Sequence, residues 1–421
     1  MNESESVAIE APVASTSRRR FVQSSSGLAA VGLAATPALW TGRSHAQSDE
    51  FRVGWIRPTT GRLASSFAPL YAGGLIALEE LNAAGGIMGK KIVLVEEDDE
   101  ASPAKEPAVI RKLKSAGIDV VVGPTGSPQV LASLSATTPS KMIQCGIANG
   151  TELTEAAKYP YHFLCGFNTD QEGELAATYM REQLKIGKIG ILHENTQFGE
   201  TAAAATRRRL KQLTGADALA VQSYAMTATD LSAQMSNLQK AGCEGIVIWM
   251  ASNVHIAMAF NLMARMNWLP PVIGHVNLFN DALFDLVPFE AMKSVYGMYY
   301  RSYTYTDREP VSPRNAAMSK KLAALPAAKG IEAFIAGCPH YDFLYLLKAV
   351  IEQEKSFDVE AIRRALNNLR GYKALVGDLS FSETSHAGLS TAGLTLAAVA
   401  SGKDPRSQGV NAATRLRAPG A

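Results

Sequence analysis

Six short polar segments hold the side chains best suited to bind a small molecule, and each directly follows a predicted β-strand. They span residues 59–61, 124–127, 148–151, 195–199, 251–253 and 275–277, and Ser, Thr, Asn and Gly are frequent in them. In an open parallel sheet the ligand crevice lies beyond the carboxyl ends of the strands. Each segment alone is equally typical of ordinary helix capping, but their recurrence at one topological position favours a binding crevice.

The segment at 124–127 is predicted to open a helix, so its backbone N–H groups and hydroxyls suit an anion. No motif predicts catalysis. The seven histidines form no H-E-x-x-H motif, and the sequence has neither a G-x-S-x-G elbow nor a phosphate-binding G-x-x-x-x-G-K loop. The acidic run at 96–100 could hold a cation, although a solvated loop is the simpler interpretation. The sequence therefore predicts a binding protein without cofactor or metal, and not an enzyme.

The four cysteines, Cys145, Cys165, Cys243 and Cys338, include no C-x-x-C pair, so neither a zinc site nor a thioredoxin-like motif is predicted. Cys145 and Cys165 lie in neighbouring predicted strands and could pair in an oxidising compartment. A chain of this length can build a large core without disulfides, and buried free thiols are the favoured interpretation.

The polar segments are connected by short apolar strands that alternate with longer amphipathic helices. In the first block the predicted strands are 51–56, 91–96, 119–123, 141–146 and 162–166, and the helices are 68–84, 104–116 and 129–137. In the second block the strands are 188–193, 218–224, 245–250 and 271–274, and the helices are 172–185, 200–213, 231–241 and 255–266. Short apolar strands between helices indicate parallel sheets covered on both faces. We therefore expect an α/β fold of two doubly wound parallel-sheet lobes. A strand at 296–300 and a helix at 341–353 are expected to return to the first lobe.

The charge balance argues against a nucleic-acid partner. Among 421 residues, 41 are basic and 39 are acidic, for a formal net charge of +2, whereas a nucleic-acid-binding surface would show a concentrated basic excess. The run of arginines at 207–209 falls in a predicted helix and is expected to be a solvated face. Beyond the N-terminal region, no stretch is long and apolar enough for stable membrane insertion.

The first 46 residues are predicted to be an export signal. Arg18, Arg19 and Arg20 precede Phe21 and a short apolar stretch at 27–39, and a small-x-small cleavage pattern then ends at Ala46. This order is typical of a secretory signal, and the paired arginines resemble the S-R-R-x-F-L-K motif of twin-arginine signals. We expect cleavage after about Ala46 and a mature chain located in the periplasm.

Residues 77–90 read A-L-E-E-L-N-A-A-G-G-I-M-G-K and closely resemble the I-x-x-I-N-A-x-G-G-I-x-G-x stretch of the leucine/isoleucine/valine-binding protein family. These are type I periplasmic solute-binding proteins of branched-chain amino-acid ABC importers. Supporting pieces lie at 96–99, 122–124, 147–154, 193–199 and 377–381, and the resemblance runs from about residue 51 to about residue 403.

The resemblance implies a type I periplasmic binding-protein fold, in which two lobes joined by three crossovers close on the ligand like a hinge. With residues 1–46 as the predicted signal peptide, it implies 47–166 plus 297–383 as lobe 1, 167–296 plus 384–405 as lobe 2 and 406–421 as a C-terminal tail. It further implies a monomer that captures a small-molecule solute and delivers it to ABC permease and ATPase subunits.

By position, the resemblance assigns Ser127 and the backbone of Thr125 and Gly126 to the ligand carboxylate. Ala148 and Asn149 would lie beside it, and Phe198 falls where an aromatic side chain covers the ligand. The other ligand-binding positions are expected to be Trp249 and Ser252 on the far side, His275 and Asn277 in a later loop, and Thr60 and Arg62 at the entrance.

The loop at 275–277 departs from the family pattern. Amino-acid binders of the family carry an acidic residue there that pairs with the ligand ammonium, whereas this chain has no carboxylate until Asp281. An ammonium buried without a charged partner is costly, so an aliphatic or aromatic carboxylate, an amide or a urea-like solute fits as well as an amino acid. The family's common early disulfide is also absent, because Ala101, Ser102 and Thr125 stand at those positions. Besides transport, a ligand sensor for amides or aromatic acids and a degenerate enzyme remain alternatives.

Overall fold

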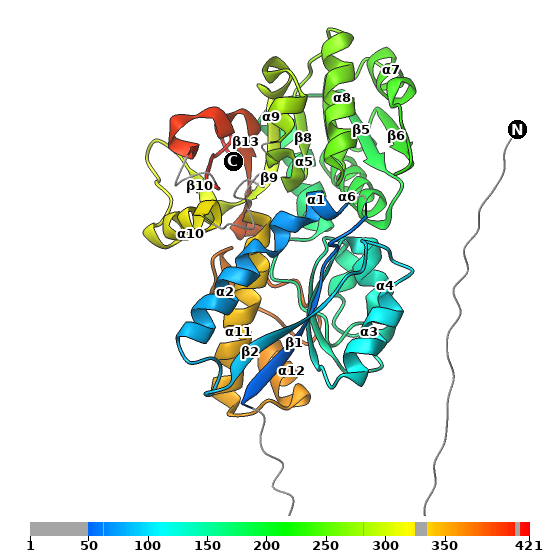
Figure 1. The fold of residues 1–421 in the computed structure, drawn as a ribbon. Helices are drawn as coiled ribbons and strands as arrows, with labels where there is room; N and C mark the ends of the chain where they lie inside the picture. Colours follow the sequence, from blue (N-terminus) through cyan, green and yellow to red (C-terminus); the bar gives the residue numbers. More distant parts are fainter. Residues whose placement is uncertain (1–48, 62, 281, 325–334, 409–412) are drawn as a thin grey trace, which may run out of the picture. The chain divides into compact units, whose positions relative to one another are not determined.

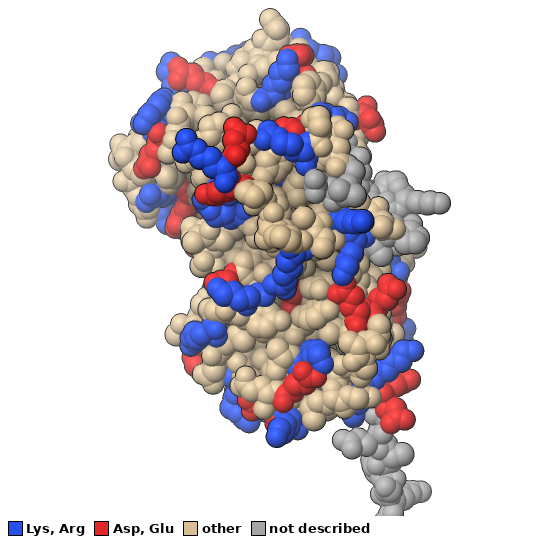
Figure 2. Space-filling model, turned by 90° about the vertical axis from the view of Figure 1, so that its left-hand side faces the viewer, with Lys and Arg blue, Asp and Glu red and all other residues tan. Residues whose placement is uncertain are grey.

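The computed structural model describes residues 49–61, 63–280, 282–324, 335–408 and 413–421. The predicted signal peptide with its cleavage site at Ala46, and the predicted entrance residue Arg62, lie outside the described residues. Within the described ranges no helix is long and apolar enough to cross a membrane. On the face shown in Figure 2, basic and acidic side chains are interspersed and do not gather into a large patch of one sign.

The first lobe is built on a four-stranded parallel sheet of order β2-β1-β3-β4. Its strands are β1 (Glu50–Ile56), β2 (Lys91–Glu97), β3 (Val120–Thr125) and β4 (Ile143–Ile147). Helices α2 (Ala72–Ala83) and α11 (Cys338–Glu354) pack against each other on one face, and α3 (Glu106–Ser115) and α4 (Ser127–Thr137) cover the other face (Figure 1). Helices α1 (Ala64–Phe67) and α12 (Val359–Asn367) complete this lobe. Because both faces are covered, β3 is buried along its whole length.

The second lobe is built on a six-stranded sheet of order β13-β9-β8-β7-β5-β6. Its strands are β5 (Ile189–Glu194), β6 (Ala220–Tyr224), β7 (Gly245–Trp249), β8 (Val272–Gly274), β9 (Val295–Tyr300) and β13 (Leu394–Ala398). The strands run parallel except for β13, which pairs antiparallel with β9. The helices are α5 (Thr169–Glu182), α6 (Gln197–Thr214), α7 (Ser232–Lys240), α8 (Asn253–Arg265) and α9 (Leu283–Leu286). The expected α/β fold of two doubly wound lobes is confirmed.

The chain passes between the two sheets three times: between β4 and α5, between β9 and α11, and between α12 and β13. The remaining elements lie along the second and third of these connections and at the C-terminus. They are β10 (Thr304–Tyr305), α10 (Pro313–Ala324), β11 (Tyr372–Lys373), β12 (Asp378–Leu379) and β14 (Arg415–Leu416).

Three local predictions need correction. The strand expected at 296–300 to return to the first lobe is β9, which pairs with β8 in the second sheet, because an apolar strand does not itself specify its neighbours. The stretch at 162–166 forms only isolated bridges, to Gln144 and Ala387. The acidic run at 96–100 is not simply a solvated loop, because Asp99 is fully buried.

The last described residues, 413–421, pack against the second lobe and against the connection that follows β9. β14 pairs with β10, and the Tyr299 hydroxyl donates to the Ala413 carbonyl at 2.5 Å. The Arg417 guanidinium donates to Thr304 and to the Glu309 carboxylate. All four cysteines are buried free thiols, as the sequence favoured.

Candidate functional site

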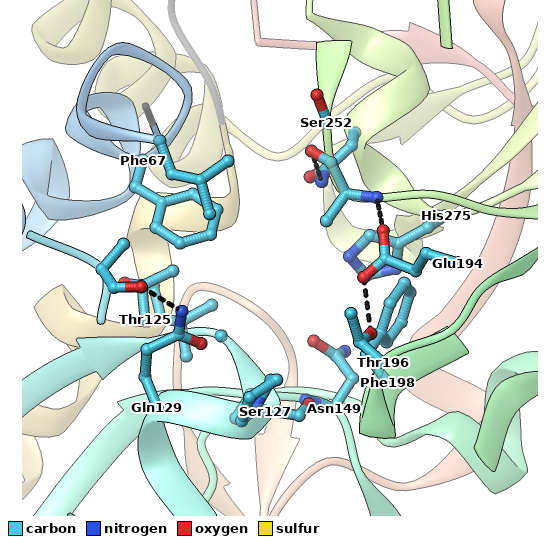
Figure 3. A pocket seen from close by; sticks show the side chains of 18 of the residues that line it. Phe67, Thr125, Ser127, Gln129, Asn149, Glu194, Thr196, Phe198, Ser252 and His275 are labelled. Atoms are coloured by element: carbon cyan, nitrogen blue, oxygen red, sulfur yellow. Dashed lines mark hydrogen bonds between the residues drawn. The ribbon is translucent and has the colours of Figure 1, made fainter. Parts of the chain in front are cut away.

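A cavity of about 650 Å³ lies where the carboxyl ends of strands from both sheets meet (Figure 3). Nine residues singled out from the sequence line it: Thr125, Gly126, Ser127, Ala148, Asn149, Phe198, Ser252, His275 and Asn277. This volume falls in the range typical of pockets for small organic molecules. The topology therefore brings together loops that are up to about 150 residues apart in the chain, as expected for strands that point their carboxyl ends to one edge.

The wall from the first lobe is built around the start of α4. Gly126 caps this helix with φ of +100°, a conformation that disfavours side chains, and a Cβ there would lie 2.2 Å from the Gln129 side chain. The Ser127 Oγ accepts hydrogen bonds from the backbone N–H groups of Asn149 (3.2 Å) and Gly150 (3.1 Å). Because both acceptor positions of the hydroxyl are used, its proton remains available to donate into the cavity. The Ser127 hydroxyl proton and the positive end of the helix both favour an acceptor or anionic group of a ligand.

Hydrogen bonds behind this wall hold its residues in place. The Thr125 hydroxyl donates to the Tyr71 hydroxyl (2.9 Å), which in turn donates to the Ile56 carbonyl (2.6 Å). The Gln129 amide donates to the Ala101 carbonyl (2.7 Å) and thereby fixes a neighbouring loop of the cavity. Thr125, Tyr71 and Ile56 are all buried, so the hydrogen bonds that join them favour a rigid wall.

The wall from the second lobe carries a carboxylate that the sequence analysis did not select. Glu194 is the last residue of β5, is 3% exposed and lines the cavity. One of its oxygens accepts from the Thr196 hydroxyl (2.6 Å) and the other from the Ala251 backbone N–H (2.8 Å). Burial raises the pKa of Glu194, and these two hydrogen bonds and the nearby His275 act in the opposite direction. Gly199 lets the first turn of α6 lie close to the Glu194 backbone, because a Cβ at position 199 would lie 2.1 Å from the Glu194 carbonyl oxygen.

His275 forms the second ionisable element of this wall. Its Nδ1 lies 2.5 Å from the carboxylate of Glu172, a residue of α5 that is fully buried. Burial raises the pKa of Glu172, and the neighbouring His275 opposes that shift. The imidazole also contacts the Phe198 ring, with 4.8 Å between ring centroids. The His275 ring is therefore held in one orientation from two sides.

Two of the positions expected in the site do not line the cavity. Trp249 is fully buried in the second lobe, where its Nε1 donates to the Thr206 hydroxyl (3.1 Å) and its ring supports Phe198 from behind. Thr60 lies in an exposed loop, where its hydroxyl donates to Asp98 (2.8 Å). In the first case, the alternation of side chains along β7 turns Trp249 to the face of the sheet where α6 and its Thr206 lie.

The sequence offered a signal for Glu194 but none for Glu172. Glu194 directly follows the strand predicted at 188–193 and directly precedes one of the six polar segments. Glu172 lies in an amphipathic helix 103 residues before its partner His275, and no local pattern relates the two. Apolar side chains from both lobes complete the cavity: Leu63, Phe67, Leu70, Phe167, Met226, Val254 and Met258.

Charges are few in this cavity. Among the described residues that line it, Glu194 is the acidic side chain, His255 and His275 are the histidines, and Lys and Arg are missing. The described part of the chain also contains no group of three or more potential metal ligands. Such an arrangement can bind and orient a small polar molecule with an apolar body.

A family model described as "Periplasmic binding protein" matches residues 50–404 of the chain. The Leu/Ile/Val-binding protein homolog 1 of Brucella abortus is 24% identical over 327 residues, which cover 77% of this chain and 84% of that protein. The Leucine-specific-binding protein of Salmonella typhimurium is 31% identical over 197 residues, covering 46% of this chain and 53% of that protein.

Solved structures show the same fold. The branched-chain amino acid binding protein LivJ of Streptococcus pneumoniae, solved with isoleucine, is 20% identical with a TM-score of 0.71, and the match covers 83% of this chain and 95% of LivJ. A periplasmic binding protein type 1 from Bordetella pertussis is 22% identical with a TM-score of 0.75 over 83% and 96% of the two chains. A solute-binding protein of Rhodopseudomonas palustris, solved with 3,4-dihydroxy benzoic acid, is 18% identical with a TM-score of 0.70 over 83% and 93%.

Proposed function

The chain belongs to the periplasmic binding protein family, whose members bind solutes and are not enzymes, and we propose that it is the solute receptor of an ABC importer. In this proposal it captures a small amino-acid-like, carboxylate or amide solute between its two lobes and delivers it to a membrane permease and its ATPase. The observation that carries the proposal is the cavity at the carboxyl ends of both sheets, with polar groups from each lobe directed into it.

The polar groups at the two walls differ in kind, which suits a solute with two polar ends. Ser127 and the start of α4 offer donors at one wall, and the Glu194 carboxylate offers an acceptor at the other. Between them, aromatic and aliphatic side chains such as Phe67, Phe198 and Met258 provide apolar contact. A small solute with a polar group at each end and an apolar body between them would match the polar walls and the apolar middle of the cavity.

The three connections between the sheets support a hinge mechanism, in which the lobes close on the bound solute. We assign the segments around 166–168, 300–304 and 380–393 to the hinge. Among the described residues, lobe 1 then comprises 49–166 plus about 301–383, and lobe 2 comprises 167–300 plus the residues from 384 on, with 413–421 included because Tyr179 and Tyr299 bond to them. Closure would exclude water from the polar contacts and strengthen them.

We further propose that a twin-arginine signal exports the protein and is cleaved after about Ala46, so that a monomer operates in the periplasm. The basic residues before a short apolar stretch support this location, as does the family to which the chain belongs. Mass spectrometry of the protein from a periplasmic extract, with and without an active twin-arginine translocase, tests the route and the cleavage site. An intact N-terminus in the extract would contradict it.

Sensing is the alternative use of the same cavity, in which a closed receptor signals to a regulator in place of a permease. Deleting the gene and measuring uptake of the bound solute by whole cells separates the two. Transport predicts lost uptake that is restored by the wild-type gene, whereas sensing predicts a lost transcriptional response with uptake retained.

Solute binding itself is tested by a thermal-shift screen over amino acids, aromatic and aliphatic carboxylates, amides and urea, followed by calorimetry. Binding to the native state alone adds about 2.7 kcal/mol to the free energy of unfolding at a concentration 100-fold above Kd. Ser127→Phe should fill the cavity and abolish the shift, and Ser135→Phe on the exposed face of the same helix is the matched control. If no compound of any class shifts the melting temperature, the proposal is wrong.

A further inference from the structure

We propose that Glu194 selects the solute by binding a protonated nitrogen, so that the protein takes an ammonium-bearing solute in preference to a plain carboxylate. The inference rests on the proposed solute-binding function and adds the charge class of the solute. The loop at 275–277 has no carboxylate, but β5 brings one to the same wall of the cavity, next to His275 (Figure 3).

The geometry of Glu194 leaves it free to accept further hydrogen bonds. Each of its oxygens accepts one bond from its own lobe, from Thr196 and from Ala251. A carboxylate offers about four acceptor positions, so positions remain for a donor from the ligand. In Figure 3 the side chain stands on the wall opposite Gln129 and Thr125, with the cavity between them.

The charge of Glu194 is not matched by the groups that hold it. Thr196 and Ala251 supply neutral donors, and no ion-pair partner of Glu194 is found in the described part of the chain. A buried carboxylate without a charged partner is costly, and burial accordingly raises the pKa of Glu194. A ligand ammonium at this position would compensate the charge, whereas a ligand carboxylate would add a second negative charge beside it.

His275 is the nearest candidate for neutralising Glu194, but its partner is Glu172. The Nδ1 of His275 is directed to the Glu172 carboxylate at 2.5 Å, and Glu172 is fully buried with its second oxygen unpaired among the described residues. This contact engages the His275 Nδ1, and no hydrogen bond or ion pair joins the His275 side chain to Glu194 among the described residues. Glu172 is therefore a positioning residue, which holds His275 and leaves Glu194 bonded only to neutral donors in the described part of the chain.

The opposite wall explains why a solute with both charges also fits. Ser127 and the first turn of α4 supply donors without a formal positive charge. Such neutral donors can accept a carboxylate but give it less electrostatic stabilisation than Lys or Arg would. We therefore expect an ammonium group to be required and a carboxylate to be tolerated.

The test compares probes of one shape and three charges by calorimetry with the mature wild-type protein. L-phenylalanine carries both charges, 2-phenylethylamine only the ammonium and 3-phenylpropionate only the carboxylate; L-leucine, 3-methylbutylamine and 4-methylpentanoate form a second, smaller set. In the set that fits, the two ammonium-bearing probes should bind about 10-fold to 100-fold more tightly than the carboxylate, the size expected for a charged hydrogen bond.

Two measurements assign this preference to Glu194. Glu194→Gln should lower the affinity for the ammonium-bearing probes about 10-fold or more and leave the carboxylate unchanged or tighter. Glu200→Gln, which removes an equal charge from an exposed position on the first turn of α6, should change neither. At mildly acidic pH, binding of the amine to the wild type should release protons, because a cation favours the ionised form of Glu194. Titrations in buffers of different ionisation enthalpy measure this release even if the Gln variant does not fold.

The possible outcomes separate the two proposals. If the carboxylate probes bind the wild type as tightly as the amines, Glu194 does not select an ammonium, although solute binding stands. Proton release that persists in Glu194→Gln would assign the effect to His275 and Glu172 and would also overturn the inference. If neither these probes nor the broader screen shows binding, the proposed function itself fails.

Discussion

We expect the free energy of unfolding to fall less with rising pH in the Glu106→Gln variant than in the wild type. Glu106 and Asp99 are both fully buried, on the two sides of a loop that includes the cavity-lining residues Ala101 and Pro103. Burial, followed by the neighbouring Asp99 carboxylate, raises the pKa of Glu106 to about 10 from an ordinary value of 4.5. Burial likewise raises the pKa of Asp99.

The direction of the effect follows from where the proton binds more tightly. Because the folded state holds the Glu106 proton more strongly than the unfolded state, this group favours folding below about pH 4.5, and that contribution is lost as the pH rises toward 10. Each pH unit between these limits costs up to about 1.4 kcal/mol. Between pH 5 and pH 8 the loss is therefore about 2–4 kcal/mol, where the upper figure assumes the full shift.

Glutamine has the shape of the protonated acid and cannot ionise. Glu106→Gln should therefore match the wild type in free energy of unfolding at pH 5 and exceed it by about 2–4 kcal/mol at pH 8. Urea unfolding followed by circular dichroism at both pH values measures the difference, with Glu354→Gln on the exposed end of α11 as the control. Equal pH dependence in the wild type and in Glu106→Gln would refute the reasoning.

Three further changes test other parts of the structure. Ser127→Ala should weaken binding of a carboxylate-bearing solute about 10-fold or more, because it removes a donor to a charged group; unchanged affinity in calorimetry would place the carboxylate elsewhere. Trp249→Phe should lower the free energy of unfolding by about 1 kcal/mol through loss of the bond to Thr206 but change the affinity less than about threefold, and a large loss of affinity would show that the indole contacts the solute. Deleting residues 413–421 should lower the melting temperature because β14 and the bond from Tyr299 to Ala413 are lost; an unchanged thermal scan would contradict that role.

The local pattern of the sequence was sufficient to predict most elements and most of the cavity-lining loops. The strand predicted at 188–193 is β5 (Ile189–Glu194), and the helix predicted at 200–213 lies within α6 (Gln197–Thr214). These elements can be predicted from the sequence because apolar periodicity and turn residues depend on only a few neighbouring positions. Nine of the twelve positions that the family resemblance assigned to the site line the cavity.

Other features depend on contacts between distant segments. The neighbours of β9 are settled by packing against β8 and β13, so its assignment to the first lobe was wrong. Packing of the Trp249 side chain against α6 makes it a core residue and not part of the cavity wall. Glu194 lines the cavity because the carboxyl ends of both sheets meet there.

The sequence by itself thus determined the alternation of strands and helices, the two lobes and the polar loops beyond the strands, since each is encoded by residues close together in the chain. The tertiary structure decided the charge of the cavity. It brings Glu172 to His275 across 103 positions and turns the buried carboxylate of Glu194 toward a space shared by both lobes. No local pattern encodes that arrangement, because burial and pairing of charges arise only when distant segments pack together.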